Sequence, residues 1–184
     1  MPRIPPLPEG DWDDDLRPIL EAAPRRLEGG RLGDNNIFSS LARHKDLFRA
    51  WLPFGGFLLG GGTLPARERE LLILRTGYNC GSSYEWGQHV RIAEVIGMDR
   101  AEILRVAEGP DADGWSAADA TLLRAADELH ERSRISDQTW AALAETYDER
   151  GLIEIPMLVG HYHLVAYALN SLEVELDEGL EPLP

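Results

Sequence analysis

RERELLILRTGYNCGSSYEWGQHVRIAEVIGMD, residues 67–99, is the stretch of the sequence that decides the fold. Apolar residues 71–74 follow a charged start, which is the pattern of a helix that enters a core, and the polar segment 77–83 interrupts that pattern. A second helix is predicted to begin at Ser82 or Ser83, where either hydroxyl can cap it, and to stop at a glycine after residue 96. Two consecutive helices are therefore expected here.

The second of these helices carries polar groups on an otherwise apolar stripe. The stripe recurs at three- and four-residue steps. It consists of Ser82, Glu85, Trp86, His89, Ile92, Ala93 and Ile96. One interpretation of Glu85 and His89 is a structural i,i+4 pair, which contributes only about 0.2–0.5 kcal/mol. The other interpretation is an acid–base pair at a catalytic site.

An acid and a histidine in this stretch match the spacing of a known signature. The four positions concerned are Glu70, Ser82, Glu85 and His89. They resemble the signature of the carboxymuconolactone decarboxylase and alkylhydroperoxidase D family, which reads Glu, eleven residues, Cys, two residues, Cys, three residues, His. Ser82 and Glu85 replace the two cysteines, so the chain resembles the redox-inactive branch of the family, which lacks the CxxC pair. The resemblance covers residues 36–172 and is strongest over 67–98.

A rival register of the same signature pairs Glu68 with Cys80. It keeps one thiol, but it places Ser83 at the second cysteine position and Gly87 at the histidine position, so the base is lost. The register that retains the acid together with the histidine is preferred.

The resemblance implies an all-α, alkylhydroperoxidase D-like helical domain, and family members assemble as trimers or hexamers. Helical periodicity in the rest of the chain agrees with this, and strand-like alternation is absent from the sequence. We expect an N-terminal arm with a short helix over residues 1–30, the helical domain over 31–175 and an acidic tail over 176–184. Trp12 is expected to anchor the proline-rich arm.

Further helices are predicted from apolar spacing and capping residues. They are expected over residues 13–27, 36–52 with a bend near His44, 99–108, 116–132, 136–147 and 153–172 with Pro156 in the first turn. The glycine-rich segment after Pro53 is interpreted as a buried helix that packs through its glycines, in preference to a ligand-binding loop. The apolar stretch from Trp51 to Leu59, together with the arm, also predicts a homo-oligomer.

Composition limits the possible functions. Asp plus Glu outnumber Lys plus Arg by 32 to 18, and the net charge of −14 argues against nucleic acid and anionic membranes as partners. The single cysteine, Cys80, cannot form an intramolecular disulfide, and the first residues lack the pattern of a secretion signal, so a cytoplasmic location is expected. The weakly polar run Trp51–Gly62 is shorter than the roughly 20 residues of a membrane span.

The chemistry implied by the resemblance is acid–base chemistry. Replacement of both signature cysteines removes the dithiol that thiol-dependent peroxide reduction requires. His89 can exchange a proton near neutral pH, and Glu85 or Glu70 can orient it. The residues expected to bind substrate are Tyr84, Trp86, Ser82 and Arg75. No metal and no cofactor are expected, because His161 and His163 lie two residues apart and point to different helix faces; no role is assigned to them or to Asn170.

Two classes of function are considered. The leading hypothesis is a decarboxylase or related proton-transfer enzyme that acts on a small carboxylated lactone, enol or β-keto acid. The alternative is a non-catalytic or regulatory oligomeric scaffold. Alkylhydroperoxidase activity is the least favoured, because one thiol alone needs an external thiol as resolving partner.

Overall fold

The computed structural model describes residues 1–23 and 30–184, and this described part is helical without any strand. Its α-helices are α1 (Arg17–Leu20), α2 (Asn36–Leu41), α3 (Lys45–Gly60), α4 (Ala66–Asn79), α5 (Ser83–Val95), α6 (Arg100–Glu108), α7 (Ala117–Arg132), α8 (Asp137–Ala144) and α9 (Glu149–Leu172). Short 3-10 helices lie at Glu9–Asp11 and Leu32–Asp34. The predicted all-α fold is confirmed.

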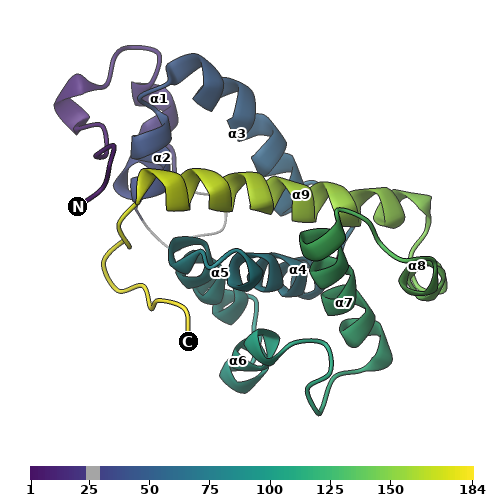
Figure 1. The fold of residues 1–184 in the computed structure, drawn as a ribbon. Helices are drawn as coiled ribbons and strands as arrows, with labels where there is room; N and C mark the ends of the chain where they lie inside the picture. Colours follow the sequence, from purple (N-terminus) through teal and green to yellow (C-terminus); the bar gives the residue numbers. More distant parts are fainter. Residues whose placement is uncertain (24–29) are drawn as a thin grey trace.

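Helix α4 lies at the centre of the fold, in contact with α5, α6, α7 and α9 (Figure 1). Leu72 and Ile73 face a cluster formed with α7 and α9, whereas Leu71 and Leu74 face a second cluster formed with α5 and α6. All four side chains are at most 1% exposed. A helix that is apolar on both sides is stable only between two layers, which explains why the stretch at residues 71–74 organises the chain.

Three helix starts coincide with the starts predicted from the sequence. Asp99, Ser116 and Ser136 accept backbone hydrogen bonds at the starts of α6, α7 and α8. Each such cap typically contributes about 1 kcal/mol. Ser82 occupies the N-cap position of α5 without a capping hydrogen bond from its side chain, and Gly97, at φ +90°, follows the end of that helix.

The start of α9 was predicted too late. Asp148 accepts a hydrogen bond from Gly151 N, so the helix begins at Glu149 and not near residue 153. Pro156 consequently lies beyond the first turn, where its ring nitrogen cannot supply an intrahelical hydrogen bond. The placement of Pro156 in the first turn was therefore wrong.

The N-terminal arm lies across its own domain. Trp12 is 6% exposed and packs with Leu20 and Phe48, so it anchors the arm as predicted. Arg3 N donates to the Leu172 carbonyl at 2.9 Å, which ties the start of the chain to the end of α9. Of the helix predicted over residues 13–27, the structure has only the short α1, and residues 24–27 fall outside the described part of the chain.

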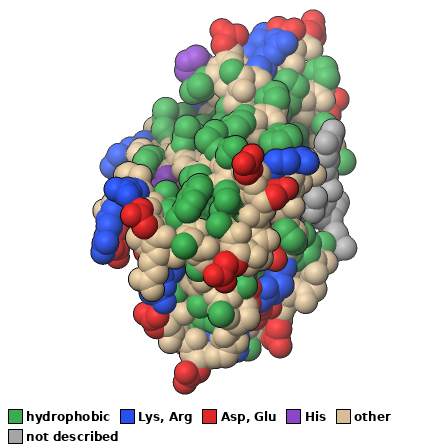
Figure 2. Space-filling model, turned by 90° about the vertical axis from the view of Figure 1, so that its right-hand side faces the viewer, with side chains coloured by type: hydrophobic (Ala, Val, Ile, Leu, Met, Phe, Trp, Pro, Cys, Tyr) green, Lys and Arg blue, Asp and Glu red, His purple; other side chains and the backbone are tan. Residues whose placement is uncertain are grey.

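The glycine-rich segment is helical, but its burial was predicted wrongly. It forms the second half of α3, which begins after the break at His44 that the sequence indicated. Leu58 is 2% exposed, whereas Phe54 and Phe57 are 41% and 55% exposed. The reason is geometric, because a helix on the outside of the domain buries one face only. Figure 2 shows a face of the molecule on which hydrophobic side chains gather at the surface.

Helix α9 is long and apolar enough to span a membrane, judged by length and composition alone. No other helix in residues 1–23 and 30–184 meets these criteria. Its most apolar window is 56% buried inside the fold, and α9 packs against α3, α4, α5, α7 and α8. Packing in the core thus accounts for the apolar character of this helix.

Candidate active site

Neighbouring helices α4 and α5 bring Glu70 and His89 together. His89 Nδ1 lies 2.6 Å from Glu70 Oε2, within hydrogen-bond distance. The residues are 0% and 7% exposed, so this polar pair is enclosed by protein. The expected hydrogen bond between His89 and a carboxylate is therefore present, and Glu70 makes it, not Glu85.

A buried arginine completes the pair on its other side. Arg69 Nε donates to Glu70 Oε1 at 3.1 Å, and Arg69 is only 4% exposed. Its Nη2 lies 3.1 Å from the same oxygen but makes no well-directed hydrogen bond within the described residues. Glu70 thus lies between a guanidinium and an imidazole, and one guanidinium nitrogen keeps unused donor capacity. Arg69 was not among the residues predicted from the sequence.

Helix α9 covers the pair with aromatic side chains. Tyr162 packs edge-to-face on His89, with ring centroids 4.9 Å apart. Burial raises the pKa of Tyr162 well above its usual range, so its phenol stays protonated at neutral pH. The neighbouring His161 stacks on Trp51, and burial lowers its pKa to about 4, with the charge of His89 adding to the effect. His161 is therefore neutral at physiological pH.

Two buried polar side chains occupy the positions of the signature cysteines. Ser82 is 0% and Glu85 2% exposed, and neither the hydroxyl nor either carboxyl oxygen finds a hydrogen-bond partner among the described residues. Burial raises the pKa of Glu85 well above its usual range and so favours the protonated, uncharged carboxyl. Gly77 makes room for it, since a Cβ there would lie 3.2 Å from Glu85 Oε1. Such unsatisfied buried groups are rare, and they mark this cluster as a candidate ligand site.

Tyr84 holds the C-terminal tail, and its place at the substrate site stays a prediction. Its hydroxyl donates to Asp177 Oδ2 at 2.6 Å and accepts from Ile37 N at 3.1 Å. Gln88, one turn further along α5, contacts both Tyr84 and Asp177. Tyr84 is therefore a structural residue that ties α5 to the tail.

Trp86 and Arg75 also serve the scaffold. Trp86 is 2% exposed and packs in the core between α4, α5 and α6. Arg75 Nε and Nη2 donate to Asp127 at 2.6 and 3.0 Å, while Nη1 donates to the carbonyls of Val106 and Ala107. Arg75 thus connects α4, α6 and α7. The arginine that contacts the Glu70–His89 pair is Arg69.

The enclosed cavity expected around His89 stays a prediction. A cavity of about 380 Å³ near the turn between α7 and α8 is lined by Glu128, Arg132, Arg134, Ser136 and Asp137. A smaller one, of about 100 Å³, lies between α5 and the C-terminal tail. His89 lines neither of these two hollows.

Cys80 is poorly suited to thiolate chemistry. Burial is the main reason that its pKa is raised to about 11. The thiol is therefore protonated at neutral pH, and the sequence holds no second cysteine to resolve an oxidised form.

Comparison with known proteins agrees with the family resemblance. The model of the carboxymuconolactone decarboxylase family matches residues 45–128, which include Glu70, Glu85 and His89. No curated protein matches the sequence significantly.

Solved structures share the fold at low sequence identity. The debrominase Bmp8 in complex with 2,3,4-tribromopyrrole superposes with a TM-score of 0.80 at 16% identity, over 95% of this chain and 91% of that one. The alkylhydroperoxidase AhpD core of an uncharacterized peroxidase-related protein from Ralstonia eutropha gives a TM-score of 0.72 at 19% identity, over 95% and 93%. The chain therefore resembles the carboxymuconolactone decarboxylase family over residues 45–128 and has an all-helical, alkylhydroperoxidase D-like fold.

Proposed function

We propose that the protein is an enzyme in which His89 acts as a general acid–base group on a small carboxylated lactone, enol or β-keto acid. The reaction is a decarboxylation or a related proton transfer and needs no cofactor. The observation that supports this proposal is the buried hydrogen bond between His89 and Glu70, with Arg69 on the far side of the carboxylate. An imidazole oriented by a buried carboxylate is the usual arrangement of a histidine base.

Glu70 selects the ring nitrogen that meets the substrate. With the Nδ1 proton held by the Glu70 carboxylate, Nε2 of His89 is the atom that exchanges a proton. It makes no hydrogen bond to any of the described residues, so it is free to face a ligand. In a decarboxylation the bond to the carboxyl carbon breaks, carbon dioxide leaves, and the electron pair forms an enolate. The imidazolium of His89 then donates its Nε2 proton to carbon and regains one from water.

The neighbouring polar groups fit a negatively charged substrate. Arg69 Nη2 can bind the carboxylate or the developing enolate, which is the role first given to Arg75. In its protonated form, which burial favours, the carboxyl of Glu85 can donate one hydrogen bond to an enolate oxygen, and the Ser82 hydroxyl can do the same. Buried polar groups without hydrogen-bond partners lower the stability of the fold. Their presence here therefore favours a catalytic protein over a scaffold.

Turnover of candidate substrates tests the proposal. A panel of small β-keto acids, enols and carboxylated lactones is incubated with the protein, and release of carbon dioxide is followed. His89→Gln should lower kcat by about 10²–10⁴-fold while the helical circular dichroism stays intact. The matched control is His44→Asn, which replaces an exposed histidine at the start of α3 and should leave turnover unchanged.

The outcomes separate the candidate functions. A scaffold gives no release above the uncatalysed rate with any member of the panel. Equal rates in the parent protein and His89→Gln contradict the role of His89. Peroxide consumption that disappears in Cys80→Ser would instead favour the peroxidase alternative, which the protonated thiol disfavours.

We also propose that the protein forms a homo-oligomer, a trimer or hexamer as the family resemblance suggests, in which one face of α9 contacts another subunit. Ile153, Met157, Leu164 and Tyr167 are 50–65% exposed and recur with the spacing of one helix face. A continuous apolar stripe of this kind is typical of an association surface. Sedimentation at micromolar concentration should give a multiple of 20.5 kDa, and Leu164→Asp should shift the protein towards the monomer. A monomeric parent protein contradicts the proposal.

A further inference from the structure

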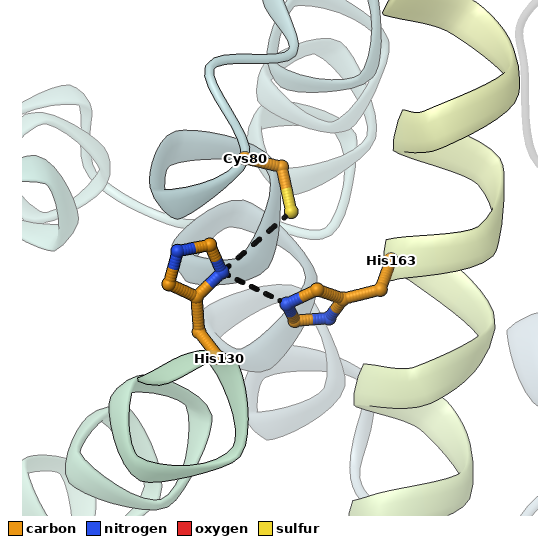
Figure 3. Close-up of side chains that lie close together, drawn as sticks. All are labelled: Cys80, His130 and His163. Atoms are coloured by element: carbon orange, nitrogen blue, oxygen red, sulfur yellow. Dashed lines mark hydrogen bonds between the residues drawn. The ribbon is translucent and has the colours of Figure 1, made fainter. Parts of the chain in front are cut away.

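Three potential metal ligands converge outside the proposed acid–base site (Figure 3). Cys80 follows the end of α4, His130 lies near the end of α7, and His163 lies on α9. His130 Nδ1 is 3.0 Å from His163 Nε2 and 3.9 Å from Cys80 Sγ, and the three ligand atoms all lie within 4.8 Å of one another. Spacing along the chain does not indicate this cluster, because the partner of His163 is on α7 and not on its own helix.

The distances are close to those of a tetrahedral site. Zinc binds imidazole nitrogen at about 2.0–2.1 Å and thiolate sulfur at about 2.3 Å, so neighbouring ligand atoms are separated by roughly 3.3–3.6 Å. The observed 3.0 and 3.9 Å lie on either side of that range. The third separation, from Cys80 Sγ to His163 Nε2, is at most 4.8 Å. Side-chain movements of up to roughly 1 Å would therefore allow all three atoms to bind one ion.

The hydrogen bonds around the cluster orient its ligands. His163 Nδ1 lies 2.8 Å from the Val159 carbonyl, which can only accept, so the proton is on Nδ1 and the Nε2 lone pair faces His130. Metal-binding histidines are commonly held in this way by a backbone carbonyl. On the opposite side, Asn170 Nδ2 donates to the carbonyl of Cys80 at 2.9 Å and fixes the backbone that carries the thiol.

The cluster is accessible to solvent. His130 is exposed and Cys80 partly exposed, whereas His163 is buried, so an ion can enter past His130. Three protein ligands leave the fourth tetrahedral position for water or a small ligand. Without a metal, a hydrogen bond from His130 Nδ1 to His163 Nε2 satisfies both rings, and this is the state that the 3.0 Å separation represents.

We propose that Cys80, His130 and His163 bind one divalent metal ion that accepts thiolate and imidazole ligands together, with Zn²⁺ as the leading candidate. Binding replaces the thiol proton by the metal, so the S–H bond breaks, a sulfur–metal bond forms and one proton is released to solvent. His130 moves its remaining proton to Nε2 and binds through Nδ1. This site is separate from the acid–base function proposed for His89.

A cobalt titration of the full chain tests the site. Co²⁺ should bind with a stoichiometry of one ion per chain and give the near-ultraviolet charge-transfer absorption of a cobalt–thiolate bond, and Zn²⁺ should abolish this absorption. Release of about one proton per ion in weakly buffered solution should accompany binding. Absence of saturable binding overturns the proposal.

Variants show whether these three residues bind the ion. Cys80→Ser should remove the charge-transfer absorption, and His163→Gln should weaken Zn²⁺ binding by at least about tenfold. His161→Gln is the matched control, since it removes a histidine two residues away on a different face of α9 and should leave affinity unchanged. Circular dichroism confirms that each variant is folded, and His130→Gln replaces any variant that is not. Unchanged affinity in both folded ligand variants contradicts the assignment.

Discussion

The protein has two histidine centres that are built in opposite ways. The Glu70–His89 pair lies on two consecutive helices and is buried, with a guanidinium and an imidazole on either side of one carboxylate. The cluster of Cys80, His130 and His163 is formed by α7, α9 and the turn after α4, lies partly in solvent, and is oriented by hydrogen bonds to two backbone carbonyls.

This difference bears on both prediction and chemistry. A pair within one helical hairpin leaves its spacing in the sequence, whereas side chains 33 and 50 residues apart in the chain leave none. In a buried ion pair each charge compensates the other. Removal of one partner therefore leaves an unpaired buried charge and lowers the stability of the fold. The partly exposed cluster of Cys80, His130 and His163 contains no buried ion pair. It can therefore gain or lose a cation without leaving an unpaired charge in the core.

The largest expected contrast is in stability. Glu70→Ala leaves the buried Arg69 guanidinium without its partner and should lower the free energy of unfolding by about 3–5 kcal/mol. His130→Ala removes one partly exposed hydrogen bond to His163 and should lower it by only about 1 kcal/mol in metal-free buffer. Urea unfolding monitored by circular dichroism measures both. Similar losses for the two variants would remove the distinction between the centres.

A second expectation is that the two centres act independently. Zn²⁺ at 100 times its Kd should stabilise the parent protein by about 2.7 kcal/mol. His89→Gln should show the same gain, because its change lies outside the metal ligands, and His163→Gln should show little. Thermal unfolding with and without Zn²⁺ measures the effect. Loss of the gain in His89→Gln would mean that the centres are linked.

A smaller effect should appear in the dependence of stability on pH. Burial raises the pKa of Glu85 in the folded state above the ordinary value of 4.5. The folded protein therefore binds more protons, and the contribution of Glu85 to stability is complete below that value and lost as pH rises towards the folded-state pKa. Glu85→Gln should accordingly gain stability relative to the parent protein between pH 5 and pH 8. Exposed Glu145→Gln serves as the control, and parallel curves for parent and Glu85→Gln would refute the burial argument.

The smallest effect is expected from Tyr84, which the sequence placed at the substrate site. Tyr84→Phe loses the hydrogen bond to Asp177 and should lower the free energy of unfolding by about 1 kcal/mol. Turnover should remain within about twofold of the parent, since the hydroxyl faces the tail and not His89. Steady-state kinetics beside urea unfolding measure both quantities, and a large drop in kcat would return Tyr84 to the site.

What could be predicted from the sequence was local. The caps at Asp99 and Ser136 depend on neighbouring backbone groups, so they could be predicted from short sequence patterns. Asp148 has the same chemistry but was not weighed as a cap, and the start of α9 was misplaced as a result. The all-α fold followed from helical periodicity and from the family resemblance.

The candidate site was predictable only where its residues share a helical hairpin. The spacing in the sequence predicted that Glu70 and His89 lie together. The directions of the other side chains depend on residues that are distant in the chain. Arg75 turns towards Asp127 on α7, 52 residues away, and Tyr84 turns towards Asp177 in the tail, 93 residues away. No local pattern indicates such contacts. Arg69 could have been noticed as a charged residue directly before the buried run, at the acid of the signature.

Chemical rescue of His89→Ala tests the acid–base role of His89 most directly. With a substrate from the panel, the variant should lose about 10²–10⁴-fold in kcat and recover part of it as imidazole is added, because free imidazole can take the place of the missing ring beside Glu70. Recovery should saturate with imidazole and be absent in the double variant Glu70→Gln, His89→Ala. Turnover in His89→Ala equal to that of the parent protein, without any added imidazole, would contradict the assignment of His89 as the proton-transfer group.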